Sequence, residues 1–194
     1  VTTAAVQKTR YAVRTARRRF PAAVVAVVGC GVAADPEGWR RRALADLVLD
    51  TREKNRLAEC LREALGRDWE LAAVPLPPPA GPDSFREPTA GLFAGRTRAS
   101  LKIQEGCDFG CSYCIVPQLR GAPRSRDWED AVAGFAELRR RGYREIVLTG
   151  VNVATYNDRG RTLPDLVARL LEFPGDFRLR LSSTEPGPAV RGVA

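Results

Sequence analysis

The chain has 194 residues, of which 44% are hydrophobic and 28% are charged, so it is typical of a folded globular protein with one large domain or two small ones. It contains no histidine, which excludes histidine-ligated zinc sites and catalysis by a Ser–His or Cys–His pair within these residues. The sequence shows no apolar run of about 20 residues and no charged-then-apolar leader, so we expect no membrane association and a cytoplasmic location.

The net charge is +8, and all but three of the 31 basic residues are arginine. A basic excess favours a polyanionic partner such as nucleic acid. A genome-wide preference for arginine codons would give the same composition, so charge alone leaves both interpretations open. The chain also lacks methionine, and we therefore expect it to be a piece of a longer protein.

The first part of the chain predicts alternating helices and strands. The expected elements are a helix over residues 4–19, a strand over 22–28, a strand over 46–49 and a helix over 53–65. Pro21 ends the first helix, and Gly66 is a suitable stop for the last one. The continuous apolar run of 22–28 is typical of a buried parallel strand.

Six prolines and a glycine over residues 74–88 exclude a helix or a central strand there. We therefore predict a linker over residues 74–95. It separates one domain of residues 1–73 from a second of residues 96–194.

The second domain repeats the pattern of strand, loop and helix. The expected elements are strands over 98–103, 145–148 and 178–181, and helices over 128–141 and 163–171. Asp127 can cap the first of these helices. Such alternation predicts a parallel sheet and an α/β fold, in which ligands gather at the carboxyl ends of the strands. Three loops fall at those ends, over residues 104–117, 149–156 and 182–186.

Three of the five cysteines fall in one loop, with the spacing C-x3-C-x2-C at Cys107, Cys111 and Cys114. Three thiolates can hold a 4Fe-4S cluster and leave one iron open, and the amino and carboxylate groups of S-adenosylmethionine (SAM) can chelate that iron. The alternatives are a zinc site, which normally needs a fourth ligand that is not nearby, and buried free thiols.

These cysteines, with Tyr113 before the last of them, resemble the signature of the radical SAM superfamily. The wider segments resemble the methylthiotransferases within it, and they are residues 101–126 (LKIQEGCDFGCSYCIVPQLRGAPRSR), 145–156, 178–186 and, in the N-terminal part, RYAVRTARRRFP, VVGC and residues 50–54. The resemblance implies an α/β fold: part of the family's N-terminal domain, followed by the first half of a partial (β/α)6 barrel.

By this resemblance, Cys107, Cys111 and Cys114 bind the cluster that chelates SAM. The other implied SAM contacts are Tyr113 near the adenine, Gly150 and Asn152 at the amino group, and Ser182, Ser183 and Glu185 at the ribose or carboxylate. The chain departs from the usual Gly-Gly-Glu motif at Val151 and Asn152, which makes backbone carbonyls the expected contacts there. The alternatives are core packing for Tyr113 and strand-end capping for Ser182, Ser183 and Glu185.

The family binds a second 4Fe-4S cluster through three cysteines of its N-terminal domain. Cys30, which follows a predicted strand and precedes a predicted turn, resembles the third of these, and the other two are expected upstream. Family members often continue with Tyr-Ala-Gln, whereas this chain has Gly31-Val32-Ala33. Cys60 lies among apolar residues and is expected to be an inert thiol.

The arginines that follow the cysteine loop, Arg120, Arg124 and Arg126, are expected to bind RNA phosphates, with a solvated basic loop as the alternative. The three runs of three arginines are interpreted as solvated helix ends.

The motifs KIQEGC, RSR and RLSSTEP are most similar to the family branch that adds a methylthio group to C2 of N6-threonylcarbamoyladenosine at position 37 of tRNA. Two other branches act on isopentenyladenosine in tRNA and on an aspartate of a ribosomal protein, and a non-enzymatic metal-binding RNA module is the alternative of another class. The resemblance implies tRNA and a reducing partner such as flavodoxin or ferredoxin. We expect the 194 residues alone to be inactive.

Overall fold

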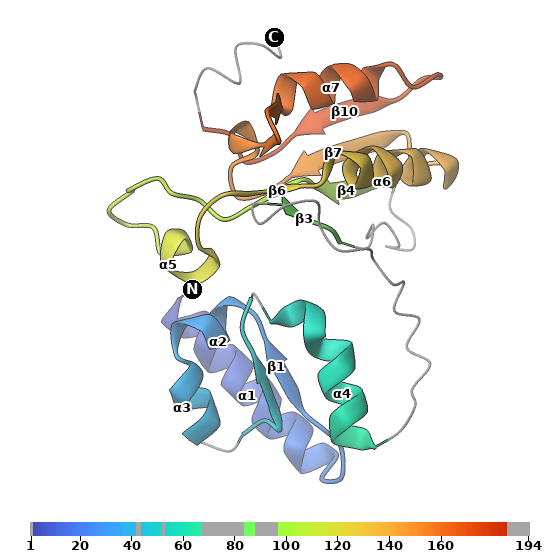
Figure 1. Ribbon diagram of the computed structural model, residues 1–194. Helices are drawn as coiled ribbons and strands as arrows, with labels where there is room; N and C mark the ends of the chain where they lie inside the picture. The colour runs from blue at the N-terminus through green and yellow to red at the C-terminus, as the bar shows by residue number, and fades with distance from the viewer. Residues whose placement is uncertain (1, 42–43, 52, 67–83, 88–96, 186–194) are drawn as a thin grey trace. The chain divides into compact units, whose positions relative to one another are not determined.

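The computed structural model describes residues 2–41, 44–51, 53–66, 84–87 and 97–185. The chain forms two compact units (Figure 1). Unit 1 consists of Val1–Ala73 with Cys111–Arg120, and unit 2 consists of Val74–Gly110 with Gly121–Ala194. Within the described residues, no helix is both long and apolar enough to cross a bilayer. The cytoplasmic location stays a prediction.

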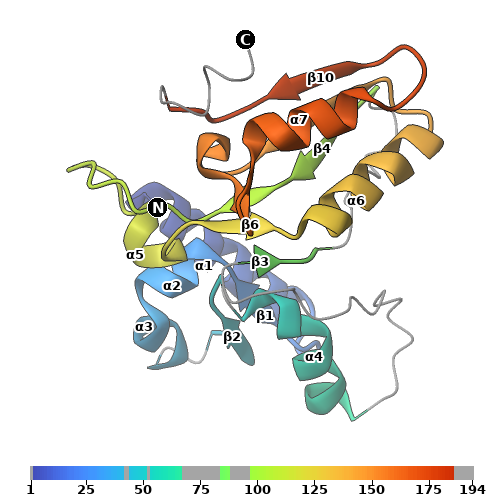
Figure 2. The same cartoon turned by 45° about the horizontal axis from the view of Figure 1, so that its top comes forward.

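Unit 1 is built around a two-stranded parallel sheet. Its elements are α1 (Thr3–Arg19), β1 (Ala26–Val28), α2 (Cys30–Ala34), α3 (Pro36–Arg41), β2 (Leu47–Leu49), a 3-10 turn η1 (Lys54–Arg56), α4 (Leu57–Leu65) and α5 (Val116–Arg120). The core consists of Val13, Val27, Val32 and Trp39. Figure 2 shows α1 running past the two strands. Val13 of α1 is buried in the same core as Val27 of β1.

The predicted helices and strands of unit 1 are present, with two corrections. The strand predicted over 22–28 is limited to Ala26–Val28, and Val28 is exposed rather than buried. Cys30 does not precede a turn, because it is the first residue of α2. Gly29, at φ +113°, lets the chain pass directly from strand to helix, a backbone conformation that disfavours other residues.

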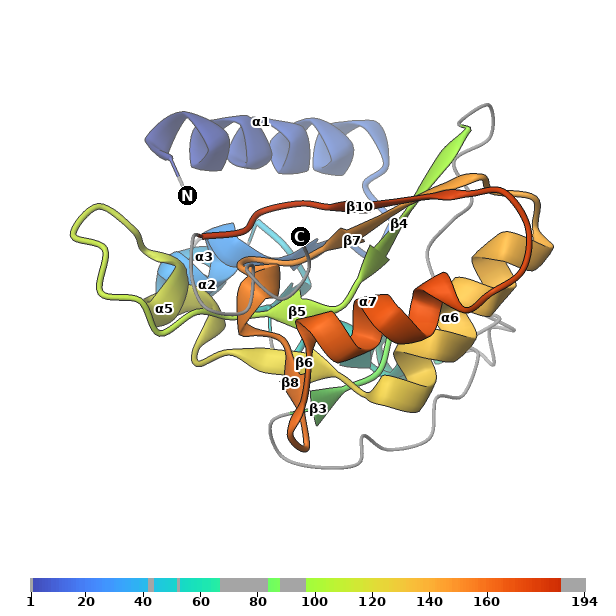
Figure 3. The same ribbon diagram turned by 90° about the horizontal axis from the view of Figure 1, so that it is seen from above.

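Unit 2 contains a three-stranded parallel sheet in the order β10-β7-β4. Its strands are β4 (Arg98–Lys102), β7 (Glu145–Thr149) and β10 (Arg178–Leu181), and its helices are α6 (Trp128–Arg140) and α7 (Leu163–Leu171). Figure 3 shows both helices on the same face of the sheet. Phe135, Leu166 and Leu170 of the helices are buried in one core with Ile146 and Leu148 of β7. The predicted parallel α/β arrangement is confirmed. The predicted cap is also confirmed, since the Asp127 carboxylate accepts from the Asp130 amide at 3.2 Å.

Unit 2 also has short strands that the sequence did not predict. They are β3 (Ser84–Phe85), β5 (Gln104–Glu105) and β6 (Arg124–Arg126), which form a sheet in the order β3-β6-β5, and the hairpin of β8 (Asn157–Asp158) and β9 (Arg161–Thr162). Strand β3 lies at the edge of its sheet and within the predicted linker. Of that linker, the structure describes only residues 84–87. The predicted domain boundaries stay predictions.

Candidate functional site

Cys107 follows the end of the β4–β5 segment and is held by its neighbours' backbone. Gly106 has φ +78°, and a Cβ atom there would lie 2.1 Å from the carbonyl oxygen of Ala122, so only glycine fits. The Cys107 amide donates to the carbonyl of Gly121 at 3.0 Å. Its sulfur is buried and accepts from the Phe109 amide at 3.4 Å. Amide donors of this kind stabilise negative charge on a cluster-ligating sulfur.

Cys111 and Cys114 belong to unit 1. A turn joins them, in which the Cys114 amide donates to the Cys111 carbonyl at 3.0 Å, and α5 begins two residues later. Cys111 is exposed, Cys114 is half-buried, and both are free thiols, as is Cys107. Three free thiols in one loop fit the donor set of a 4Fe-4S cluster with an open iron. Their role as its ligands stays a prediction.

Tyr113 is 89% exposed. Core packing, the alternative role for this side chain, is therefore wrong. Contact with an adenine ring stays a prediction.

Gln104 connects the ends of two neighbouring strands, although the sequence did not single it out. Its side chain is fully buried, and its Oε1 atom accepts from the amides of Val151 and Asn152 at 2.9 Å each. Its Nε2 atom donates to the carbonyls of Glu105 and Gly106 at 3.2 and 2.8 Å. All four hydrogen bonds go to backbone groups, so Gln104 ties the start of the cysteine loop to the loop after β7.

Gly150 and Asn152 shape the loop after β7. A Cβ atom on Gly150 would lie 2.8 Å from the Gln104 carbonyl oxygen, so the close approach of the two loops requires glycine. Asn152 is buried, and its Oδ1 atom accepts from the amides of Ala154 and Glu185 at 3.3 Å each. Its Nδ2 atom is buried without a hydrogen-bond partner among the described residues. An unpaired buried donor costs about 1–3 kcal/mol, and a bound ligand can satisfy it.

The residues after β10 meet the loop after β7. The amide of Val153 donates to the carbonyl of Ser183 at 3.0 Å, and Ser183 itself has φ 58°. The hydroxyl groups of Ser182 and Ser183 lie 3.3 Å apart, while Ser183 and Glu185 are exposed. The structure thus brings Gly150, Asn152 and the segment 182–185 together at the carboxyl ends of β7 and β10.

Cys30 and Arg120 lie side by side within unit 1. Cys30 is half-buried at the start of α2, and Nη2 of Arg120 donates to its sulfur at 3.5 Å. The Thr51 hydroxyl donates to the Leu119 carbonyl at 2.9 Å, which fixes the same end of α5. A guanidinium beside a sulfur stabilises negative charge on it. This contact gives Arg120 a role toward Cys30 that the sequence did not suggest.

Comparisons with known proteins give the family of this chain. A model of the radical SAM superfamily matches residues 101–190. A threonylcarbamoyladenosine tRNA methylthiotransferase, MtaB, of Chlamydia pneumoniae is 35% identical over 96% of this chain and 40% of its own length. The MtaB of Aquifex aeolicus is 34% identical over 94% of this chain and 44% of its own length.

The chain belongs to the radical SAM methylthiotransferases. The parallel strands of unit 2 are accordingly part of a radical SAM domain. A tRNA-2-methylthio-N(6)-dimethylallyladenosine synthase of Acidithiobacillus ferrooxidans is also 35% identical, over 89% of this chain. The chain spans about two fifths of the length of these curated relatives.

Of the three arginines predicted to bind RNA, the prediction for Arg126 is wrong. Arg126 is 2% exposed, and its guanidinium donates to the Asp130 carboxylate at 2.7 Å, to the Glu87 carbonyl at 2.7 Å and to the Lys102 carbonyl at 3.3 Å. It is therefore a structural residue of unit 2 that cannot reach a phosphate. Arg124 is partly exposed and pairs with Glu105 at 3.4 Å, and its contact with RNA stays a prediction.

A group of three acidic side chains lies apart from the cysteine loop. Carboxylate oxygens of Asp127, Glu129 and Asp158 lie within 4.8 Å of one another. Arg159 and Arg161 neutralise the group, with ion pairs of 3.0 Å from Arg159 to Asp158 and 3.1 Å from Arg161 to Glu129. Burial would raise the pKa of Asp158, but hydrogen bonds from Arg159 and a backbone amide outweigh it and lower that pKa. The group therefore anchors the β8–β9 hairpin to α6.

Proposed function

We propose that this chain carries the SAM site of a tRNA methylthiotransferase, which adds a methylthio group to C2 of N6-threonylcarbamoyladenosine at position 37. The observation that carries the proposal is the loop with three free thiols, Cys107, Cys111 and Cys114, which follows the first strand of a parallel radical SAM sheet. The MtaB names of its relatives support the choice of substrate.

The bound cluster would supply the electron that cleaves a carbon–sulfur bond of SAM. The chain's own residues hold and orient the cofactor. Cys107, Cys111 and Cys114 would hold the cluster, and the Nδ2 atom of Asn152, which is buried without a hydrogen-bond partner among the described residues, would be a donor available to SAM.

The remaining SAM contacts of the proposal are Tyr113, Gly150, Ser182, Ser183 and Glu185. Exposure of Tyr113, Ser183 and Glu185 supports this assignment, since each side chain is free to meet a ligand. Gly150 has no side chain to offer a ligand. Its role in the proposal is to let the backbone of the loop after β7 approach Gln104 closely.

A second 4Fe-4S cluster, which takes part in sulfur delivery, would use Cys30 together with two cysteines outside these 194 residues. The Arg120 guanidinium lies 3.5 Å from the Cys30 sulfur, where its positive charge would suit a cluster-bound thiolate, and this contact supports the assignment. The further partners of the proposal are tRNA and a reductant such as flavodoxin or ferredoxin.

The cluster is tested by iron and acid-labile sulfide analysis, together with EPR spectra recorded with and without SAM, on the protein that carries this chain. Replacing Cys107, Cys111 or Cys114 with alanine should abolish the SAM-dependent change in the spectrum. Cys60→Ala is the matched control and should retain it. A protein that binds only zinc, or an alanine variant of the trio that still cleaves SAM, would contradict the proposal.

The substrate is tested by mass spectrometry of nucleosides after reaction with tRNA that carries either threonylcarbamoyladenosine or isopentenyladenosine. We expect the methylthio product from the first tRNA and none from the second. Product from isopentenyladenosine, or from a ribosomal protein, would assign the chain to another branch of the family. Because the chain spans about two fifths of its relatives, we propose that the 194 residues alone give no turnover, which the same assay tests.

A further inference from the structure

Helix α1 of unit 1 carries an unbalanced positive charge. Between Thr3 and Arg19 it has six basic residues and no acidic one. Arg10, Arg14 and Arg18 follow one another at four-residue spacing, so they repel one another on the helix surface. Basic residues in a last helical turn complement the helix dipole, but Arg10 and Arg14 lie before that turn and gain little from it.

Internal ion pairs account for only part of this charge. Arg10 pairs with Asp35 at 3.7 Å, and Arg17 pairs with Asp46 at 2.6 Å. In the part of the chain that the structure describes, neither Arg14 nor Arg18 makes an ion pair or a side-chain hydrogen bond. Two guanidinium groups therefore keep their donors available to an external anion.

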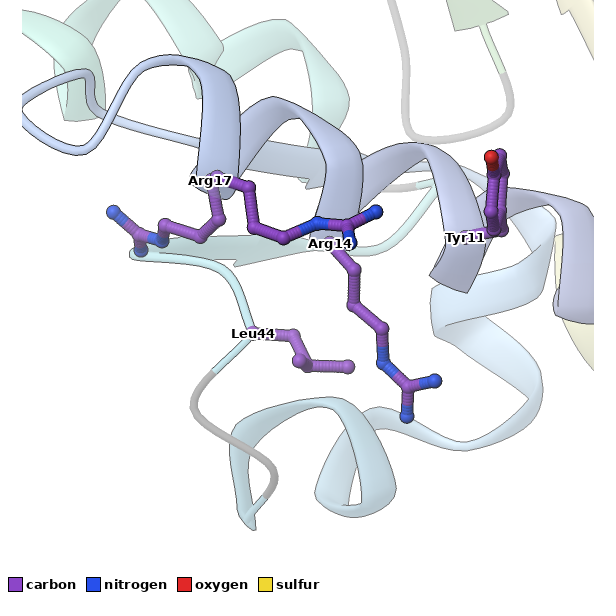
Figure 4. A pocket seen from close by; sticks show the side chains of 5 residues that line it. Tyr11, Arg14, Arg17 and Leu44 are labelled. Carbon is purple, nitrogen blue, oxygen red and sulfur yellow. The ribbon is translucent and has the colours of Figure 1, made fainter.

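The two free guanidinium groups border a hollow of about 500 Å³. It is lined by Tyr11, Arg14, Arg17, Arg18 and Leu44. Figure 4 shows Arg14 reaching from α1 alongside Leu44, with Tyr11 about one turn away along the helix. The Tyr11 ring is 69% exposed, so an aromatic face stands beside the positive charge.

We propose that this face of α1, defined by Tyr11, Arg14 and Arg18, binds the substrate RNA. Arg14 and Arg18 contact backbone phosphates, and Tyr11 stacks on an unpaired base. Guanidinium groups recognise phosphates through paired hydrogen bonds, and aromatic rings beside basic residues are typical of single-stranded RNA sites. The inference deepens the proposed function and rests on tRNA being the substrate.

RNA is favoured over an anionic membrane as the ligand of this face, because the valines of α1 pack into the core of unit 1. Val13 is buried in the core of unit 1, and Val6 packs against the same core. A helix that binds a membrane surface inserts its apolar face into the lipid. Phe20, which is exposed, lies under the Arg19 guanidinium at 5.4 Å and is a single side chain beyond the end of the helix.

The test measures binding of a fluorescent anticodon stem-loop RNA to the protein that carries this chain, by anisotropy over a range of salt concentrations. The double variant Arg14→Glu/Arg18→Glu should bind at least about tenfold more weakly and should lower the slope of log K against log salt by about 1.4–1.8, since each lost phosphate contact removes about 0.7–0.9. Its matched control is Arg40→Glu/Arg41→Glu, the same change of charge on two exposed residues of α3, which should shift binding by less than about threefold.

Tyr11 is tested separately. Tyr11→Ala should weaken binding by about tenfold, because the variant loses the stacking of a base on the ring, whereas Tyr11→Phe keeps the ring and should bind within about twofold of the original protein. Since the ring is mostly exposed, its removal leaves no cavity, and circular dichroism should show unchanged folding.

Equal RNA binding by the Arg14/Arg18 variant and its Arg40/Arg41 control would overturn the inference while leaving the proposed function intact. Failure of the unmodified protein to bind any tRNA would instead contradict the proposed function and, with it, the inference. Vesicles with 30% anionic phospholipid provide the remaining arm. Loss of vesicle binding in the Arg14/Arg18 variant, with RNA binding retained, would assign the surface to a membrane and refute the RNA proposal.

Discussion

Replacing Gln104 with methionine removes the polar group that joins the cysteine loop to the loop after β7. Methionine has a similar length and volume, so the change leaves little cavity. It removes the acceptor of the Val151 and Asn152 amides and one of the donors to the carbonyls of Glu105 and Gly106. Each buried amide left unpaired costs about 1–3 kcal/mol, so even the low end for the two amides gives about 2 kcal/mol. Domains are typically stable by about 5–15 kcal/mol, so this loss is a large part of the stability of a domain at the low end of that range.

The assay is urea denaturation followed by circular dichroism, combined with hydrogen exchange measured on peptides that cover residues 149–155. The amides of Val151 and Asn152 should lose protection in Gln104→Met even where the rest of unit 2 keeps it. Gln118→Met, at an exposed position of α5, is the matched control and should change the free energy of unfolding by less than about 0.5 kcal/mol. A loss below about 1 kcal/mol for Gln104→Met, with unchanged exchange, would refute the reasoning.

Three further predictions concern unit 2. Gly106→Ala should cost more than about 2 kcal/mol in urea denaturation, since its Cβ would collide with a carbonyl oxygen, whereas Gly160→Ala, with positive φ but open space, should cost about 1–2 kcal/mol. Phe135→Ala should lower the free energy of unfolding by about 3–5 kcal/mol in the same assay, because the ring is fully buried. Burial opposes ionisation of Glu129, but hydrogen bonds from Arg161 and Arg159 lower its pKa to about 2. Its stabilising effect is therefore present above its ordinary pKa and fades as the pH falls toward 2, so Glu129→Gln should flatten the acid side of a stability–pH curve.

Each of these has a result that contradicts it. Equal losses for Gly106→Ala and Gly160→Ala would show that the loop moves away from the added methyl group. A loss below about 1 kcal/mol for Phe135→Ala would mean that the two edge-on phenylalanine contacts at 5.2 and 5.4 Å do not persist in solution. The expected change in the free energy of unfolding for Glu129→Gln is below about 1 kcal/mol, because the Glu129 side chain is 61% exposed. If the acid side of the stability–pH curve did not change in this variant, the pH dependence would come from other carboxylates.

The longer elements could be predicted from the sequence because their pattern is local. The helices α1, α6 and α7 show apolar residues at helical spacing, and the strands of the parallel sheet are bounded by loops with glycine or proline. The short elements could not. The helices α2 and α3 have five and six residues, too few for a helical period, and the two residues of β3 become a strand only by pairing with β6. Such pairings depend on distant parts of the chain, which local propensity does not contain.

Some features of the candidate site could likewise be predicted from the sequence, and others could not. The cysteine spacing is local and stands out in the sequence, but the role of Gln104 depends on backbone groups 47 and 48 residues away. A basic loop predicts phosphate contact for all of its arginines alike. Only the fold separates Arg126, which is buried in β6 and bonded to Asp130, from the partly exposed Arg124 next to Ser125. Burial of a charged residue is thus the property that sequence patterns report least well.

At the carboxyl edge of the sheet, where strand pairing ends, side chains form the hydrogen bonds to the backbone. Beyond Thr149 the backbone leaves the ladder, and Gln104 and Asn152 supply the hydrogen bonds that a neighbouring strand would otherwise provide. These bonds come from within unit 2 and fix the loop after β7, so a ligand that bound there would need to order little of the chain. Among the described residues, the buried Nδ2 atom of Asn152 has no hydrogen-bond partner. A ligand that accepted a hydrogen bond from this atom would gain free energy, because no existing hydrogen bond would have to break.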